Sequence, residues 1–189
     1  MAFLRTPSIA RLANRALLSL SGPYASDFLN GILAAAVRDA QRRPVYSALL
    51  HAQGRVLYDV FLYTNTDDAG QQGYLIEYDS RPSEAPALLP MLKKYVLRSK
   101  VKIRDVTEQY DVWASWGSPL DCPQDTLARE WQWAPSGAVE PLWSNVDAER
   151  LWGSEDRVLF DRRAVGMGTR FLVRNGDRRA CLPFASDYR

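Results

Sequence analysis

The sequence is poor in the residues that build metal centres and disulfide scaffolds. It contains one histidine, His51, and two cysteines, Cys122 and Cys181, which lie far apart and match no metal-binding spacing. We therefore expect no His/Cys metal site built by this chain alone. A disulfide between the two cysteines is allowed by the spacing, but a reduced compartment is the simpler interpretation. His51 has no nearby triad partner and no Gly-x-Ser-x-Gly motif occurs, which argues against a serine hydrolase.

Long hydrophobic runs and an excess of one charge are missing too. The longest purely apolar run, Ile32 to Val37, is far shorter than a membrane span, and there is no secretory hydrophobic segment. The formal net charge is only +2, which is too small to indicate a nucleic-acid partner. Lysine is scarce: 20 of the 24 basic residues are arginine, and all four lysines lie between Lys93 and Lys102.

The whole sequence of 189 residues has an ordinary globular composition, with 47% hydrophobic and 24% charged residues. This length allows one domain or two modest ones, each with its own core. The first 26 residues carry Arg5, Arg11 and Arg15 and no acid. That pattern is typical of a mitochondrial presequence, and equally of a basic N-terminal arm of the mature fold.

Hydrophobic periodicity predicts strands and helices in mixed order. A first strand is expected over Arg15 to Ser21, then a short helix that opens at Gly22-Pro23 and has Asp27 in its first turn. Two apolar runs around Ala52-Gln53-Gly54 predict a β-hairpin. The remaining expected elements are a strand over 74–78, a helix after Ser83 whose start involves Pro86 or Pro90, and strands over 101–106, 110–116, 157–161 and 170–174. This order favours an α+β fold over a doubly wound one.

Composition changes near residues 106 to 110. All six tryptophans lie between Trp113 and Trp152, in a stretch that also holds four prolines. We therefore expect an N-terminal α+β domain over residues 1–108. The second, Trp-rich α+β domain is expected over 109–189.

The first candidate site is the predicted hairpin turn with Gly54, Arg55 and Asp59. Glycine lets a backbone approach a ligand, and residues four apart on one strand project to the same face. A carboxylate at Asp59 could hold a protonated or N–H-rich ring. The alternative is a plain turn with a surface ion pair worth less than ~1 kcal/mol.

The second candidate lies near the C-terminal end, in the segment from Asp161 to Arg170. Asp161, Arg163, Gly168 and Arg170 could form an anion cradle, because arginine binds carboxylates through two parallel hydrogen bonds. The segment lacks the Gly-Lys-Ser/Thr ending of a phosphate loop. The alternative is a charged β-turn held by an Asp161–Arg163 pair.

The third candidate is a basic run from Lys93 to Arg104. It would suit nucleic acid, an acidic partner or an anionic lipid surface, but no aromatic stacking pattern interleaves it as single-strand binding would need. A solvated helix face and strand edge is the simpler interpretation. The tryptophans, likewise, are more often core or interface than a ligand cage.

Five motifs in one order resemble a known family. They are Asn14–Gly22, Phe28–Gly31, Tyr46–Asp59, Leu92–Val101, and Asp161-x-Arg163 followed by Gly168-x-Arg170. Together they resemble the folate-binding YgfZ-like proteins, which are relatives of the glycine-cleavage aminomethyltransferase. The similarity extends from about Arg11 to Arg189.

The resemblance implies an aminomethyltransferase-like fold of mixed antiparallel sheets with flanking helices. It also implies a role in late maturation of mitochondrial 4Fe–4S clusters in the matrix, together with A-type cluster carrier proteins, and it implies tetrahydrofolate binding. On this basis Gly54, Arg55, Asp59 and the four residues of the second candidate would contact the cofactor. No resident metal, nucleic acid or membrane segment is implied.

Two departures from the family pattern sharpen these expectations. The family's Lys-Gly-Cys-Tyr-x-Gly-Gln-Glu motif does not occur, and neither Cys122 nor Cys181 stands in a matching context. We therefore expect a chain truncated before that motif. The aminomethyltransferase relatives carry paired acids where this chain has Tyr58-Asp59. The missing acid favours an assembly role, with a folate-dependent one-carbon transferase as the alternative.

Overall fold

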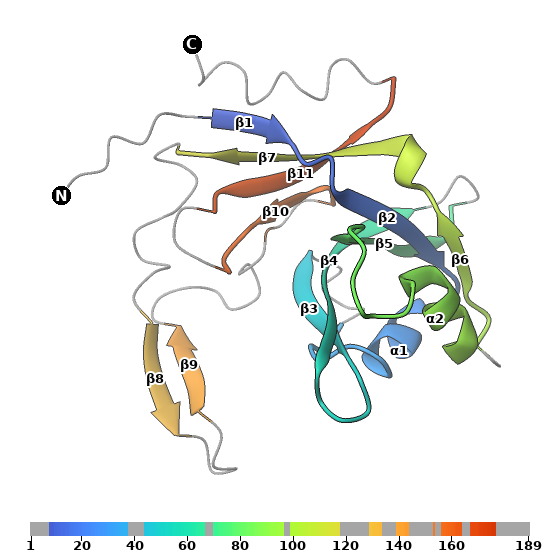
Figure 1. The fold of residues 1–189 in the computed structure, drawn as a ribbon, viewed down its shortest axis with the longest axis horizontal. Helices are drawn as coiled ribbons and strands as arrows, with labels where there is room; N and C mark the ends of the chain where they lie inside the picture. Colours follow the sequence, from blue (N-terminus) through green and yellow to red (C-terminus); the bar gives the residue numbers. More distant parts are fainter. Residues whose placement is uncertain are drawn as a thin grey trace.

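The computed structural model of the chain describes residues 8–37, 44–66, 70–96, 99–117, 129–133, 139–143, 153, 156–163 and 167–176. These residues form two large antiparallel sheets, two helices and a separate strand pair (Figure 1). The two sheets lie one against the other, and both helices lie on the far side of the larger sheet.

The larger sheet has five strands in the order β3-β4-β5-β2-β6. Their bounds are β2 (Arg15–Ser21), β3 (Val45–Leu50), β4 (Val56–Thr66), β5 (Gln72–Asp79) and β6 (Lys102–Asp105). Every pairing is antiparallel, with β3 and β4 joined as a hairpin. The strands and the hairpin expected in this half of the chain are confirmed.

Helices α1 (Ala25–Asn30) and α2 (Leu88–Tyr95) cover one face of this sheet. Asp27 lies in the first turn of α1, as expected. Pro23 does not open the helix: Tyr24 occupies the N-cap position, and the helix begins at Ala25. In α2, Pro90 lies within the first turn, where its missing N–H costs no intrahelical bond, and Pro86 lies outside.

Strand alternation gives the five-stranded sheet two buried faces. In β4, Val60 and Leu62 join the core beneath the helices, whereas Phe61 and Tyr63 join a second core shared with the smaller sheet. Successive side chains of a strand point to opposite faces, so this arrangement follows directly from the unbroken apolar run. The second core also takes Val112, Leu159 and Leu172 from later in the chain.

The smaller sheet has the order β1-β7-β11-β10. Its strands are β1 (Ser8–Arg11), β7 (Tyr110–Trp116), β10 (Val158–Phe160) and β11 (Thr169–Arg174), and a 3-10 turn over Thr107–Gln109 leads into β7. The strands expected over 110–116, 157–161 and 170–174 are confirmed. Arg11 and Arg15 belong to strands, which matches the basic-arm interpretation for the described part of the N-terminal segment.

Strands β8 (Arg129–Trp133) and β9 (Val139–Trp143) pair only with each other and lie apart from both larger sheets (Figure 1). The side chain of Trp133 is 78% exposed. Trp113 is half-buried in β7 and Trp116 is exposed at its end. Trp113 and Trp116 thus belong to the smaller sheet, and Trp133 belongs to the separate strand pair.

The sheets and helices confirm the α+β class. The division into segments 1–108 and 109–189 stays a prediction. The strand pairing shows that Ser8–Arg11 joins the sheet formed by the later residues. In the described ranges, no helix is long and apolar enough to cross a membrane.

Candidate functional site

The β3–β4 turn is tight and is built as expected. Gly54 has φ of 81°, a left-handed conformation that glycine adopts without a steric cost. The His51 amide donates to the Arg55 carbonyl at 2.7 Å, and the Gly54 amide donates to the His51 carbonyl at 2.8 Å. Arg55 is exposed at the turn. Asp59 pairs with Arg163 instead of Arg55, so the surface ion pair along the strand, which we held open as an alternative, is not formed.

The turn between β10 and β11 is held by backbone and side-chain bonds. The Asp161 amide donates to the Gly168 carbonyl at 2.8 Å, and Arg163 binds Asp161 through Nε (3.0 Å) and NH2 (2.9 Å). Gly168 has φ of 72° and lies so close to β7 that a Cβ would collide with the Ser115 carbonyl oxygen. The Asp161–Arg163 turn that we held open as an alternative is thus present.

The β10–β11 turn and strand β4 meet in one chain of charges between the two sheets. Arg163 NH1 donates to Asp59 Oδ2 at 2.9 Å, which joins the β10–β11 turn to β4. Arg170 links Asp161 to Glu77 at 2.7 and 2.6 Å, and Arg15 reaches the same Glu77 oxygen at 2.7 Å. Three carboxylates and three guanidiniums therefore alternate without a break, and their formal charges cancel.

Most of this chain of charges is buried. Glu77 is fully buried, and the side chains of Asp161, Arg170 and Arg15 are almost completely so. Separating buried charges from their partners is expensive, because nothing else in the interior replaces the lost solvation. The exposed end is the Arg163–Asp59 pair, in which both side chains keep about a quarter to a third of their surface.

The titration behaviour of the chain follows from these contacts. Burial raises the pKa of the Asp161 carboxyl, but hydrogen bonds from Arg163 and Arg170 outweigh it and hold that pKa below its usual value. Burial and the neighbouring Glu77 raise the pKa of Tyr63 well above the ordinary range. Tyr63 is therefore protonated and donates to Glu77 Oε2 at 2.7 Å.

One aromatic ring supports both arginines. The guanidinium carbon of Arg170 lies 4.4 Å from the centroid of the Phe61 ring, and that of Arg163 lies 4.7 Å away. Tyr46 packs against Phe61 with centroids 5.1 Å apart. Cations over aromatic faces at these distances are attracted to the ring quadrupole, and more strongly when desolvated.

Sequence reasoning missed four members of this arrangement: Arg15, Phe61, Tyr63 and Glu77. One signal was available for Glu77, which is the only charged residue between Tyr74 and Tyr78 in an otherwise apolar strand. A lone acid in a buried strand demands a cationic partner. No local pattern could identify that partner, since Arg170 lies 93 residues further along the chain.

A pocket of about 580 Å³ opens beside the exposed end of the charge chain. Asp59 lines it together with two tyrosines, Tyr46 and Tyr58, and a rim formed by Asp79, Arg81, Pro82 and Ser83. The Tyr58 hydroxyl donates to the Pro86 carbonyl at 2.8 Å. At the rim, the bonds from Arg81 lower the pKa of Asp79 to about 2. The pocket thus offers a ligand the Asp59 carboxylate and two aromatic rings, with the Asp79 carboxylate paired to Arg81 at the rim.

Comparison with known proteins supplies the family. The chain is 36% identical over 181 residues to the mitochondrial iron–sulfur cluster assembly factor IBA57 homolog of Cryptococcus neoformans, covering 93% of this chain and 46% of that protein. It is 34% identical over 190 residues to the namesake of Aspergillus fumigatus, covering 92% and 39%. The chain belongs to the IBA57 family. It spans less than half the length of these curated relatives.

Two solved structures are similar at low scores. The aminomethyltransferase T of the glycine cleavage system from Bartonella henselae gives a TM-score of 0.45 at 20% identity, covering 58% of this chain and 28% of that one. A heterotetrameric sarcosine oxidase from Corynebacterium gives 0.42 at 13% identity, covering 92% and 78%. No protein-family model matches the chain. The α+β class of this IBA57 relative therefore rests on its own sheets.

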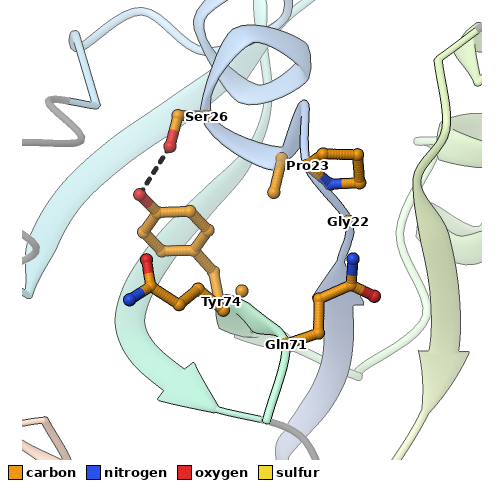
Figure 2. Close-up of a pocket in the computed structure, with 8 residues that line it drawn as sticks. Gly22, Pro23, Ser26, Gln71 and Tyr74 are labelled. Atoms are coloured by element: carbon orange, nitrogen blue, oxygen red, sulfur yellow. Dashed lines mark hydrogen bonds between the residues drawn. The ribbon is translucent and has the colours of Figure 1, made fainter. Parts of the chain in front are cut away.

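A second, smaller pocket lies where β2 turns into α1, with a volume of about 180 Å³ (Figure 2). It is lined by Gly22, Pro23, Ser26, Gln71 and Tyr74, among others, and the Ser26 and Tyr74 hydroxyls share a hydrogen bond of 2.7 Å. None of the residues predicted for ligand binding lies in it. We assign this second pocket no role in the candidate site.

The basic run divides between α2 and β6. Lys93, Lys94, Lys100, Lys102 and Arg104 are all exposed, whereas Arg98 lies outside the described residues. None of these five described residues lines the pocket at Asp59. His51 is exposed, and Cys122 and Cys181 lie outside the described residues. Across the described part of the chain, no group of three or more metal-binding side chains occurs.

Proposed function

We propose that this chain is part of an iron–sulfur cluster assembly factor that supports late maturation of 4Fe–4S proteins in the mitochondrial matrix. The observation that carries this proposal is the 36% identity to a mitochondrial IBA57 homolog over 93% of the chain. The cluster is treated as cargo handed to client enzymes. A-type cluster carriers are the partners that we expect to deliver it.

The test is depletion of the native protein, followed by re-expression. We expect aconitase activity, which needs a 4Fe–4S cluster, to fall on depletion and to return when the native protein is restored. Malate dehydrogenase, which holds no cluster, is the matched control and should stay constant. Full aconitase activity after depletion would contradict the proposal. Co-purification of the native protein with an A-type carrier tests the partner separately.

We further propose that tetrahydrofolate binds in the Asp59 pocket. The residues fit the group: a carboxylate accepts hydrogen bonds from the N–H edge of a pterin, and the rings of Tyr46 and Tyr58 offer aromatic surface. Arg55, at the neighbouring turn, is exposed and offers a cation to the ligand's carboxylates. Bound tetrahydrofolate would supply nitrogen atoms able to carry one-carbon units.

The alternative function is a folate-dependent one-carbon transferase. Two observations argue against it: one Asp59 oxygen already binds Arg163, and Asp79, the other acid in the lining, is paired with Arg81. Tyr58, where the transferase relatives have a second acid, is engaged with the Pro86 carbonyl. We expect no methylene-tetrahydrofolate when the native protein is incubated with tetrahydrofolate and an aminomethyl donor. Steady product formation above the protein-free rate would favour the transferase.

A further inference from the structure

Arg163 uses all three of its nitrogens on two carboxylates. Its Nε and NH2 bind the two oxygens of Asp161, and NH1, on the remaining edge, binds Asp59 Oδ2. A guanidinium is planar, so fixing one edge fixes the direction of the other. The position of the Asp59 carboxylate therefore depends on how firmly Asp161 holds Arg163.

Asp161 is itself held from the interior. Its carboxylate is almost fully buried, and it accepts a second hydrogen bond from Arg170, which is anchored on Glu77. The Phe61 ring lies beneath both guanidiniums. The buried part of the charge chain thus fixes the orientation of Arg163, and Arg163 in turn fixes the Asp59 carboxylate at the wall of the pocket.

We propose that Arg163 is a positioning residue that orients Asp59 toward a ligand, an inference that rests on the proposed folate site. Among the described residues only Oδ2 of Asp59 has a hydrogen-bond partner, which leaves Oδ1 for the ligand. A carboxylate held in place loses less rotational freedom on binding than a free one. The same arrangement selects the ligand class, because a fixed acceptor favours an N–H-bearing ring edge and repels an anionic one.

Lysine at position 163 keeps the charge but cannot bind two carboxylates along two edges of a plane. Arg163→Lys therefore separates geometry from charge. The matched control is Arg11→Lys, which makes the same chemical change at an arginine that binds a carboxylate, Asp111, outside both the charge chain and the pocket. Arg163→Gln is a second variant, which tests the same position if the lysine variant does not fold.

The experiment is calorimetric titration of the full chain with two probes. One probe is 5-formyltetrahydrofolate, and the other is p-aminobenzoylglutamate, which lacks the pterin ring. We expect Arg163→Lys to weaken 5-formyltetrahydrofolate binding about tenfold, the factor for one lost charge-assisted hydrogen bond, and Arg11→Lys to change it less than about twofold. Binding of p-aminobenzoylglutamate should be equal in all variants.

A double-variant cycle distinguishes a positioning role of Arg163 from a merely structural one. If Arg163 acts through Asp59, then adding Arg163→Lys to Asp59→Asn costs no further affinity. Equal losses in Arg163→Lys and Arg11→Lys, or full additivity with Asp59→Asn, would overturn the positioning role. Absence of 5-formyltetrahydrofolate binding in the unaltered chain would overturn the folate site itself, whereas the aconitase test is independent of both.

Discussion

On one face of the five-stranded sheet, Val60, Leu62 and Ile76 pack beneath helices α1 and α2, in a core of apolar side chains and aromatic rings. On the other face, the same strands place Phe61, Tyr63 and Glu77 against the smaller sheet. The first face is stabilised by removing apolar surface from water, which needs no particular direction. The second also contains two buried charges of each sign and one partly exposed pair, and the partners must lie at hydrogen-bond distance. This face is the one that leads to the candidate site.

The largest expected effect breaks the charged face. Glu77→Ala leaves Arg15 and Arg170 buried without the carboxylate that both bind, so we expect the free energy of unfolding to fall by about 3–5 kcal/mol. Urea denaturation followed by tryptophan fluorescence measures it. Glu108→Ala, at an exposed acid, is the control and should change stability by less than about 0.5 kcal/mol. A loss below 1 kcal/mol for Glu77→Ala would show that the arginines find other partners.

The matching change on the apolar face is Leu62→Ala. Leu62 is fully buried, so its truncation loses transfer free energy and leaves a cavity, with an expected cost of about 3 kcal/mol. The same denaturation assay applies, with the half-exposed Leu50→Ala as its control. Unlike the change at Glu77, this loss should be independent of pH between 5 and 8. A pH-dependent loss would mean that the two faces are not separate.

A third prediction concerns the pH dependence of the stability that the charged face contributes. Because the pKa of Asp161 is lower folded than unfolded, its ionised form contributes stability that is complete above the unfolded value and is lost as pH falls through the folded one. We expect Asp161→Asn to cost about 2 kcal/mol at pH 7, and the gap to the unaltered protein to narrow below about pH 4. Unfolding curves at pH 7, 5, 4 and 3 measure it. A constant gap would contradict the prediction.

The smallest effect lies at the pocket rim. Arg81 and Asp79 form a pair in which Arg81 is largely exposed to solvent, so Arg81→Gln should change the stability of the protein little. The substitution should nevertheless move the pKa of Asp79 up from about 2 toward its ordinary value, because the hydrogen bonds from Arg81 lower it. Carboxyl-detected NMR titration measures this shift. An unchanged pKa would show that another group is responsible.

Most of the apolar architecture could be predicted from the sequence. The alternation in Arg15–Ser21, the apolar run in Val56–Thr66, the turn at Gly54 and the spacing in α2 depend on residues close together in the chain. Pro23 shows where local reasoning failed. Proline suits the first helical position, yet the helix begins two residues later, after a turn in which the Ala25 amide binds the Gly22 carbonyl.

The candidate site was predictable only in part. Asp59, Asp161, Arg163 and Arg170 were singled out from two separate turns, and the structure brings them together. Arg55 and Gly54 remain at the hairpin turn, and Gly168 serves the close approach to β7. Which acid meets which arginine was beyond the sequence, because Asp59 and Arg163 are 104 residues apart.

The scarcity of histidine, cysteine and lysine made arginine and the carboxylates the main charged chemistry of the chain. The sequence alone also determined the strands, the hairpin and the apolar alternation, since hydrophobic burial depends on residue type and period. Only the tertiary structure decided that six charges from β2, β4, β5, β11 and the β10–β11 turn form one chain ending at a pocket. Hydrogen bonds between charged groups depend on direction and distance, and two packed sheets supply both.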